Sequence, residues 1–267
     1  MLKYFVAGWI FLFIPNSLFA QTWELGGFAG GSGYMGDLNP IRPYQVNRLA
    51  YGGFFKRNID PYWSIKLSVL HGEIAASDAN SGNDQFKLRN LSFFTPINEL
   101  SLQAELNFFN YIPSVSKKRY TPFLFTGFSL VSFNPRTVGF DGNTYELNLF
   151  ATEGQAPNNS YKTYSFAVPF GAGVKCNLFK SWSLIGEIGY RTAFTDYLDD
   201  VSGKYPDPGK LVNPIAYTLS DRSGEVNEGV NLGFPGTQRG DYRPHDTYFF
   251  VGAGISFTFL SDKCYTW

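Results

Sequence analysis

One stretch of the sequence decides the fold: Asn98-Glu99-Leu100-Ser101-Leu102-Gln103-Ala104-Glu105-Leu106-Asn107-Phe108. After Asn98, every second residue is apolar, and the residues between them are polar. Successive side chains of a β-strand point to opposite faces, so this period of two predicts a strand with one apolar and one polar face. Such a strand fits either a soluble sandwich or a membrane barrel.

The same alternation recurs along the chain, and no segment keeps a helical period of 3.6. Five segments show the alternation clearly. Three others are also expected to be strands, but glycine and aromatic residues blur their alternation, so the sequence does not show which of their side chains face inward. The sequence thus predicts eight strands, each long enough for the roughly 9–11 residues of a tilted membrane strand. The clear segments lie within 62–75, 93–109, 164–177, 181–194 and 246–259, and the noisier ones within 23–34, 47–58 and 120–133.

The lengths of the connections favour a barrel over a sandwich. Short connections follow the even strands and long connections follow the odd strands, a pattern typical of membrane barrels with periplasmic turns and extracellular loops. We therefore predict an all-β, eight-stranded antiparallel up-and-down transmembrane β-barrel with both termini in the periplasm. The short connections are 59–61, 110–119 and 178–180, and the long ones are 35–46, 76–92, 134–163 and 195–245.

Composition narrows the class of protein. The 22 Lys and Arg residues balance the 22 Asp and Glu residues among 267 positions, and no basic run occurs. Phosphate backbones need a positive field, so nucleic acid is not expected as a partner. Only 16% of residues are charged, against about 25% in typical proteins, and 18% are aromatic. This balance fits a barrel surrounded by outer-membrane lipid.

The chain begins with a segment that resembles an export signal. Lys3 precedes an apolar run from Tyr4 to Ile14, and residues 17–20 lead to a plausible cleavage site before Gln21. We expect residues 1–20 to be a signal peptide, residues 21–259 to form one outer-membrane barrel domain, and residues 260–267 to form a periplasmic tail.

The alternation also assigns charged residues to the inside of the barrel. An eight-stranded barrel has an interior that side chains just fill, so charges there must pair. Equal numbers of acids and bases predict a packed polar plug, whereas a channel would show a ring of one sign. An ordinary small-solute or ion channel remains the alternative. The predicted lumen charges are Glu24, Glu99, Glu105 and Glu187 with Lys56, Lys66, Lys175 and Arg191.

Catalytic signals are sparse. The two histidines, His71 and His245, both fall near the expected outer rim, where some outer-membrane barrels carry catalytic histidines. A rim-active lipid-modifying enzyme is therefore a second alternative. The sequence holds no HExxH, GxSxG, P-loop or CxxC motif. We expect no enzyme activity, no cofactor and no metal site.

Three stretches resemble the PorG family, the outer-membrane barrels of the type IX secretion system. Their order and placement carry the resemblance, which spans nearly the whole mature chain. It implies a non-enzymatic barrel that associates with the periplasmic ring of the PorK lipoprotein and PorN, in a machine that exports proteins and supports gliding. The stretches are Phe28–Pro40, Arg89–Phe93 followed by Glu99–Glu105, and Thr195–Ser202.

The two cysteines offer a covalent link to such a partner. Cys176 lies at the periplasmic end of the sixth predicted strand, and Cys264 lies in the tail. The periplasm is oxidising, so a disulfide is chemically accessible to both. We hypothesise that Cys264 bonds to the ring partner; an internal bond or a free thiol are the alternatives.

Overall fold

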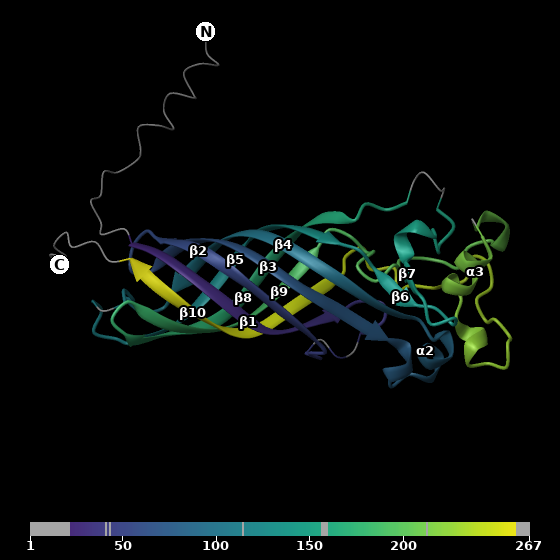
Figure 1. Cartoon of the computed structure of the whole chain (residues 1–267), viewed down its shortest axis with the longest axis horizontal. Coiled ribbons are helices and arrows are strands. Elements are labelled where there is room, and N and C mark those ends of the chain that lie inside the picture. Colours follow the sequence, from purple (N-terminus) through teal and green to yellow (C-terminus); the bar gives the residue numbers. More distant parts are fainter. Residues whose placement is uncertain are drawn as a thin grey trace, which may run out of the picture.

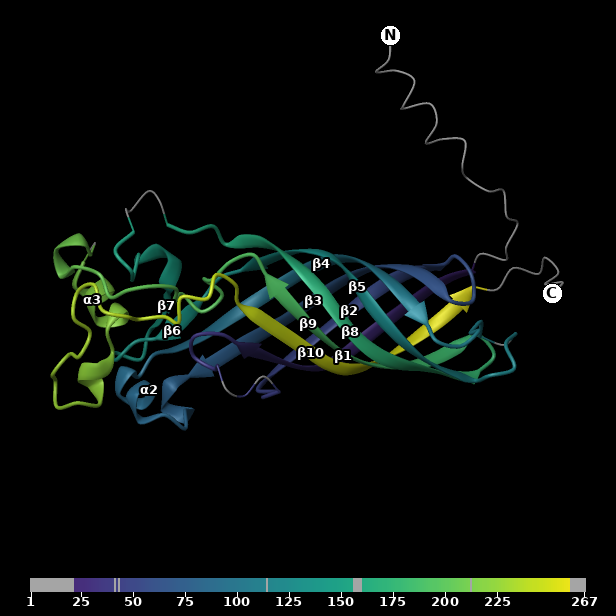
Figure 2. The ribbon, with the colours of Figure 1, turned by 180° about the vertical axis from the view of Figure 1, so that it is seen from behind.

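The structure, a computed structural model, describes residues 22–40, 42, 44–113, 115–155, 160–211 and 213–259. The predicted signal peptide, the predicted tail and Cys264 lie outside the described residues. The described chain forms one long barrel with a compact set of loops at one end (Figures 1 and 2). In this part of the chain, no helix is long and apolar enough to cross a membrane.

Eight antiparallel strands build the barrel, in agreement with the prediction. Each pairs with its neighbours in the chain, and β1 pairs with β10. The strands are β1 (Thr22–Met35), β2 (Arg48–Asn58), β3 (Trp63–Ser77), β4 (Ser92–Asn107), β5 (Tyr120–Phe133), β8 (Tyr164–Phe179), β9 (Trp182–Ala193) and β10 (Thr247–Phe259).

The pairing register shows how the barrel closes. Thr22 of β1 pairs with Asn58, and the register followed from strand to strand returns to β1 at Ser32, ten residues further along. Eight strands with this stagger must tilt against the barrel axis, and they enclose a space that side chains fill. The predicted barrel is therefore confirmed as a closed and narrow one.

The connections gather at the two ends of the barrel as the sequence predicted, but their lengths alternate less strictly, since 36–47 and 108–119 both have twelve residues. Short turns, at 59–62, 108–119 and 180–181, gather at the end where β1 begins and β10 ends. Long loops, at 36–47, 78–91, 134–163 and 194–246, gather at the other end. Their short elements are η3 (Asp78–Asn80), α2 (Asp84–Arg89), β6 (Arg136–Val138), β7 (Thr144–Glu146), η4 (Leu147–Leu149), η5 (Pro208–Lys210), α3 (Pro214–Ser220) and η6 (Ser223–Glu225).

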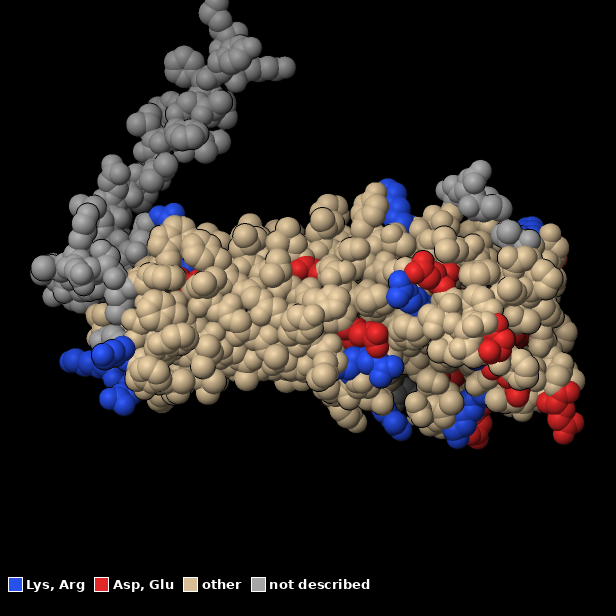
Figure 3. Space-filling model, viewed as in Figure 1, with Lys and Arg blue, Asp and Glu red and all other residues tan. Residues whose placement is uncertain are grey.

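The outer surface of the barrel is apolar. Figure 3 shows few charged atoms around its middle, while basic side chains stand out at the short-turn end. Tryptophans at that end, Trp23, Trp63 and Trp182, are 36–48% exposed and form part of an aromatic girdle. A continuous apolar belt with aromatic borders is the surface that a bilayer requires of a barrel. Leucines of this belt include Leu67, Leu100, Leu102, Leu124 and Leu184.

The predicted facing holds for the clearest strands, with two corrections. In β4, Leu100 and Leu102 are exposed, and Glu99 and Glu105 are buried, as predicted. Phe249 has outward parity but is buried, and its ring lies with the Gln45 carbonyl in the space that a Cβ at Gly33 would occupy.

The second correction concerns the aromatic residues of the barrel, which do not all face lipid. Several lie inside, and their side chains need glycines opposite them: a Cβ at Gly26 would collide with the Phe54 ring. Apolar residues on both faces blur the alternation of β1, β2 and β5. The inward aromatic side chains are Phe28, Phe54, Phe123, Phe125 and Phe250.

Candidate functional sites in the lumen and the loop cap

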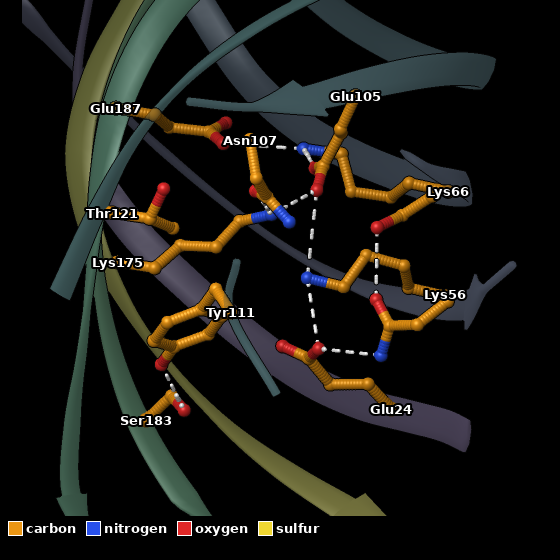
Figure 4. Close-up of polar contacts among 12 residues, drawn as sticks. Glu24, Lys56, Lys66, Glu105, Asn107, Tyr111, Thr121, Lys175, Ser183 and Glu187 are labelled. Atoms are coloured by element: carbon orange, nitrogen blue, oxygen red, sulfur yellow. Dashed lines mark hydrogen bonds and ion pairs between the residues drawn. The ribbon is translucent and has the colours of Figure 1, made fainter. Parts of the chain in front are cut away.

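The lumen near the short-turn end holds a network of six charged side chains (Figure 4). Its centre is Glu105, whose Oε1 lies 3.0 Å from Lys66 Nζ and whose Oε2 lies 2.6 Å from Lys175 Nζ and 3.5 Å from Lys56 Nζ. Glu24 Oε2 accepts from Lys56 at 2.9 Å, and Glu187 Oε2 from Lys66 at 3.2 Å.

Strand register places these residues together. Glu24, Lys56 and Lys66 are successive register partners on β1, β2 and β3, all at inward positions. The network contains three acids and three bases, nearly all of them inaccessible to solvent. Charges in such a site are stable only when each has a counter-charge and hydrogen-bonding partners. The arrangement therefore fills the lumen without a net charge.

The turn between β4 and β5 closes the network at the short-turn end. Tyr111 and Ile112 of this turn are both 5% exposed. The Tyr111 hydroxyl lies 2.8 Å from Ser183 Oγ of β9, across the barrel mouth (Figure 4). A buried tyrosine usually satisfies its hydroxyl in this way. The turn is thus folded inward and its aromatic ring occupies the opening.

A second, separate ion pair lies further along the lumen. Arg191 Nε donates to Glu99 Oε2 at 3.2 Å, and the Tyr248 hydroxyl donates to the same oxygen at 2.6 Å. Aromatic side chains separate this pair from the six-residue network, since the Lys66 ammonium lies 5.0 Å from the Phe125 ring centre and the Arg191 guanidinium 5.9 Å from that of Phe250. Such contacts add cation–π stabilisation in a dry environment.

The eight predicted lumen residues thus fall into two groups, which the sequence did not separate. The two histidines are not brought together among the described residues. His71 faces outward from β3, with its Nδ1 2.8 Å from Asn98 Oδ1, and His245 packs its ring against Phe194. Cys176 is half-buried near the short-turn end of β8.

At the other end, the long loops form a cap tied by buried arginines. Arg239 of the last loop is 3% exposed, and its Nη1 donates to Glu153 Oε1 at 3.0 Å and to the Asp200 carbonyl at 2.7 Å. Arg89, which ends α2, donates through Nε to Asp78 Oδ2 at 2.7 Å and through Nη2 to the Asp37 carbonyl at 3.0 Å.

A hydrogen bond links these two arginines, since Arg89 Nη1 donates to the Arg239 carbonyl at 2.7 Å. All four long loops contribute a residue to this network: Asp37 from the first, Asp78 and Arg89 from the second, Glu153 from the third and Arg239 from the fourth. The loops are therefore one folded unit above the barrel.

A cluster of carboxyl groups lies beneath these ties. The Tyr34 hydroxyl is 2.6 Å from Asp199 Oδ2 and 2.9 Å from Asp246 Oδ1. A hydroxyl has one proton to donate, so one of the two carboxyls must donate in return, and it must be protonated to do so. Asp37 is buried nearby, and its Oδ1 accepts from the Asp241 amide.

Burial raises the pKa values of this carboxyl cluster. Burial and the neighbouring carboxyls of Asp196 and Asp241 raise the pKa of Asp37 to about 8. The pKa values of Asp199 and Asp246 rise well above the ordinary value, because both are buried and each faces other carboxyls. The pKa of Asp196 rises to about 7, mainly through burial. Among the described residues, no cluster of His, Cys, Asp or Glu has a geometry suited to a metal ion.

The sequence did not predict that the long loops are joined by a network of buried contacts. Loop residues follow no period, so nothing in the alternation predicts that Arg239 is buried. One signal was present: the stretches Phe28–Pro40, Arg89–Phe93 and Thr195–Ser202 contain Asp37, Arg89, Asp199 and Asp200, which meet in the cap or line its ties.

Comparison with known proteins places the chain in a family. Residues 3–267 match the model of a family described as a domain of unknown function, DUF6089. The chain belongs to the DUF6089 family. No curated protein matches this DUF6089 sequence.

Several solved structures of small barrels are similar to this DUF6089 protein. The N-terminal β-barrel domain of Pseudomonas aeruginosa OprF is 12% identical, with a TM-score of 0.40, and the match covers 90% of this chain and 98% of that one. OprG of Pseudomonas aeruginosa is 11% identical, with a TM-score of 0.42 and coverage of 91% and 97%. Neisserial surface protein A is 8% identical, with a TM-score of 0.41 and coverage of 89% and 97%. At these TM-scores the likeness carries no functional weight.

Proposed function

We propose that this DUF6089 barrel is a non-enzymatic outer-membrane component of the type IX secretion and gliding machinery, and that it associates with the periplasmic ring of PorK and PorN. The observation that carries the proposal is the filled lumen. Six paired charges, an aromatic layer and Tyr111 occupy the interior from the short-turn end inward. A filled barrel serves as an anchor in the membrane and makes a poor conduit.

The resemblance to PorG supplies the identity of the partners. Its three stretches lie far apart in the sequence, and residues of each meet in the loop cap. The resembling stretches therefore contribute to one folded part of the molecule, the loop cap, as well as to the strands. In this proposal both chain ends lie on the periplasmic side, since β1 begins and β10 ends at the short-turn end.

The short-turn end offers a surface suited to a partner. The turn 108–119 has twelve residues, although the other two turns connect their strands with four and two. A groove of about 480 Å³ lies against it, lined by Tyr62, Phe109, Lys117 and Lys118 among others. Among the described residues of the three turns and their flanks, the charges are Arg57, Lys117, Lys118, Arg119 and Lys180, with Asp60 as the acid. An acidic partner surface would complement this end.

A pull-down from detergent extracts tests the association. We expect tagged protein to recover PorK and PorN, and the double variant Lys117→Glu/Lys118→Glu to recover at least fivefold less, because reversed charges repel an acidic surface. The matched control, Lys87→Glu/Lys204→Glu at the loop end, should recover the ring unchanged. A tagged barrel that comes down without the ring contradicts the proposal.

Planar-bilayer conductance separates this reading from the channel alternative. We expect the purified barrel to show no steady open level. A stable conductance in the unchanged protein would favour the channel and contradict the filled lumen as the basis of function.

We further propose that Cys264 forms the link to the ring lipoprotein. Non-reducing gels of whole membranes should show a band heavier than the monomer, which reductant and Cys264→Ser abolish and Cys176→Ser retains. A band at the monomer mass in both conditions contradicts the covalent link and leaves the pull-down prediction untouched.

A further inference from the structure

A shallow groove lies on the outside of the barrel, over β2 to β5. It has a volume of about 650 Å³, and its lining is apolar toward the short-turn end. Four register partners form its floor: Gly53, Val69, Leu100 and Leu130. Gly53 has no side chain to project outward, and the other three are 44–55% exposed. The floor therefore presents a hollow of hydrocarbon character to the bilayer.

The next set of register partners, toward the loop end, is different in chemistry. Tyr51, His71, Asn98 and Ser132 pair across the same four strands, face outward and line the same groove. His71 Nδ1 lies 2.8 Å from Asn98 Oδ1, and the Tyr51 ring lies 5.4 Å from the His71 ring. The amide oxygen can only accept, so Nδ1 donates and Nε2 is left for another partner.

Polar side chains on the lipid face of a barrel are costly toward the middle of the membrane and cost less near its surface. Their placement on all four strands, directly above an apolar hollow, gives the groove a polar end and an apolar end. Charged groups of both signs lie beyond the polar end, outside the lining of the groove. Arg48 lies at the outer end of β2, where its Nε is 2.5 Å from Glu73 Oε1, and Lys162 precedes β8, with Nζ 5.7 Å from the Tyr164 ring centre.

We infer that this groove is a binding site for a phosphorylated glycolipid of the lipid A type. An acyl chain would lie along Val69, Leu100 and Leu130. A sugar hydroxyl would donate to His71 Nε2 beside Asn98, and a phosphate would lie beyond it, toward Arg48 and Lys162. The polar end points to the long-loop side, hence to the outer leaflet, where lipid A is the membrane lipid that carries both phosphate and several acyl chains.

This inference rests on the barrel's place in the outer membrane and is independent of the proposed secretion role. A ring partner would engage the short-turn end, at the opposite border of the apolar belt. Failure of one experiment therefore leaves the other intact.

Native mass spectrometry of the purified barrel tests the site. The protein is extracted in mild detergent from outer membranes that contain lipopolysaccharide, and retained lipids are weighed. We expect one lipid A molecule on the unchanged protein and at least fivefold lower occupancy on Leu100→Trp, whose indole fills the groove floor. Leu102→Trp is the matched control, since Leu102 faces outward on the same strand and lies outside the groove. It should retain lipid A.

Relipidation identifies the contribution of the polar end. Delipidated protein receives either purified lipid A or phosphatidylglycerol, and heat-modifiable migration on gels confirms that each variant is folded. We expect His71→Ala/Asn98→Ala to weaken lipid A binding about fivefold, the loss that follows from one hydrogen bond donated by a sugar hydroxyl. Phosphatidylglycerol binding should remain as in the unchanged protein.

Three outcomes overturn the inference: an unchanged protein without lipid A, equal occupancy of Leu100→Trp and Leu102→Trp, or a groove that retains phosphatidylglycerol in preference to lipid A.

Discussion

The lumen network and the loop cap are both buried clusters of charge, but they become neutral in different ways. In the lumen, three acids face three bases, and Glu105 alone contacts three lysines. In the cap, Asp37, Asp199 and Asp246 lie together, and the contacts of the latter two are the Tyr34 hydroxyl and backbone N–H groups. The lumen pairs its charges, whereas the carboxyl cluster of the cap has raised pKa values that favour protonation.

The difference follows from where each cluster lies. Lumen residues project from strands of fixed register in the membrane-embedded barrel, so acids and bases on neighbouring strands are held in place for pairing. Cap residues belong to loops at the end of the barrel, where protons can exchange with water. The cap is therefore expected to respond to pH.

The largest expected effect comes from breaking the lumen network. Glu105→Ala leaves three buried lysines without their shared partner and should lower the free energy of unfolding by about 3–5 kcal/mol. Urea unfolding, followed by the heat-modifiable band on gels, measures this. Glu73→Ala removes an acid from a half-exposed pair with Arg48 and should shift the midpoint little. Equal midpoints for the two variants would contradict the central role of Glu105.

The next largest effect is expected from a variant that loosens the cap and leaves the barrel intact. Arg239→Ala removes donors to Glu153, Asp200 and Ser220, and leaves the Glu153 carboxylate without its guanidinium. We expect limited proteolysis to cleave the connection 194–246 at least tenfold faster, as a local loss of about 1.5–3 kcal/mol implies. The urea midpoint of the strands should stay unchanged. A cap as resistant as that of the unchanged protein would show that Arg89 suffices.

A smaller effect should reveal the protons held in the cap. The folded pKa values of Asp37, Asp199 and Asp246 lie above the ordinary value of 3.8, so their folded forms bind more protons than the unfolded chain. Cap stability is then fully present below about pH 4 and falls as the pH rises through the folded values, to about 8 for Asp37.

Hydrogen exchange of the cap amides, corrected for intrinsic rates, measures this at pH 6 and pH 9. We expect faster opening at pH 9. Asp199→Asn imitates the protonated carboxyl and should slow the opening at pH 9 by on the order of tenfold, while Asp84→Asn in exposed α2 should not. If opening is independent of pH in the unchanged protein, the cap does not retain protons.

The smallest effect is expected at an exposed ion pair, which serves as a reference for the buried charges of the lumen and the cap. Lys87 and Asp84 form an exposed pair with an Nζ–Oδ1 distance of 3.0 Å, and their side chains are 49% and 90% exposed. Lys87→Ala should change the free energy of unfolding by less than about 0.5 kcal/mol. A larger change in urea unfolding would mean that α2 supports the cap through more than Arg89.

The sequence predicts the barrel well because its strands obey a strict period. In β4 each residue faces either lipid or the lumen, so Leu100 and Glu105 can be assigned from parity alone. The blurred strands show the limit of this reasoning. Where the lumen is itself apolar, as at Phe54 and Phe125, parity gives no contrast between the two faces.

The division of the lumen charges could not be read from alternation. Parity tells that Glu99 and Glu105 face inward, but their partners depend on stagger and tilt, which place Lys175 beside Glu105 and Arg191 beside Glu99. The contacts within the cap could not be predicted for another reason. Its hydrogen bonds join loop residues such as Arg89 and Arg239, which are 150 positions apart and follow no repeating pattern.

The β6–β7 hairpin has a practical consequence for cell biology. It pairs with the outer end of β4 through Phe94 and Arg136, and its tip at Gly142 has a φ of 78° with open space around it. In the proposed orientation, a short peptide epitope inserted there would be exposed on the outside of the cell, away from the buried contacts that hold the cap. Fluorescent labelling of that epitope would let the barrel be followed by light microscopy as the cell moves, without disturbing either chain end.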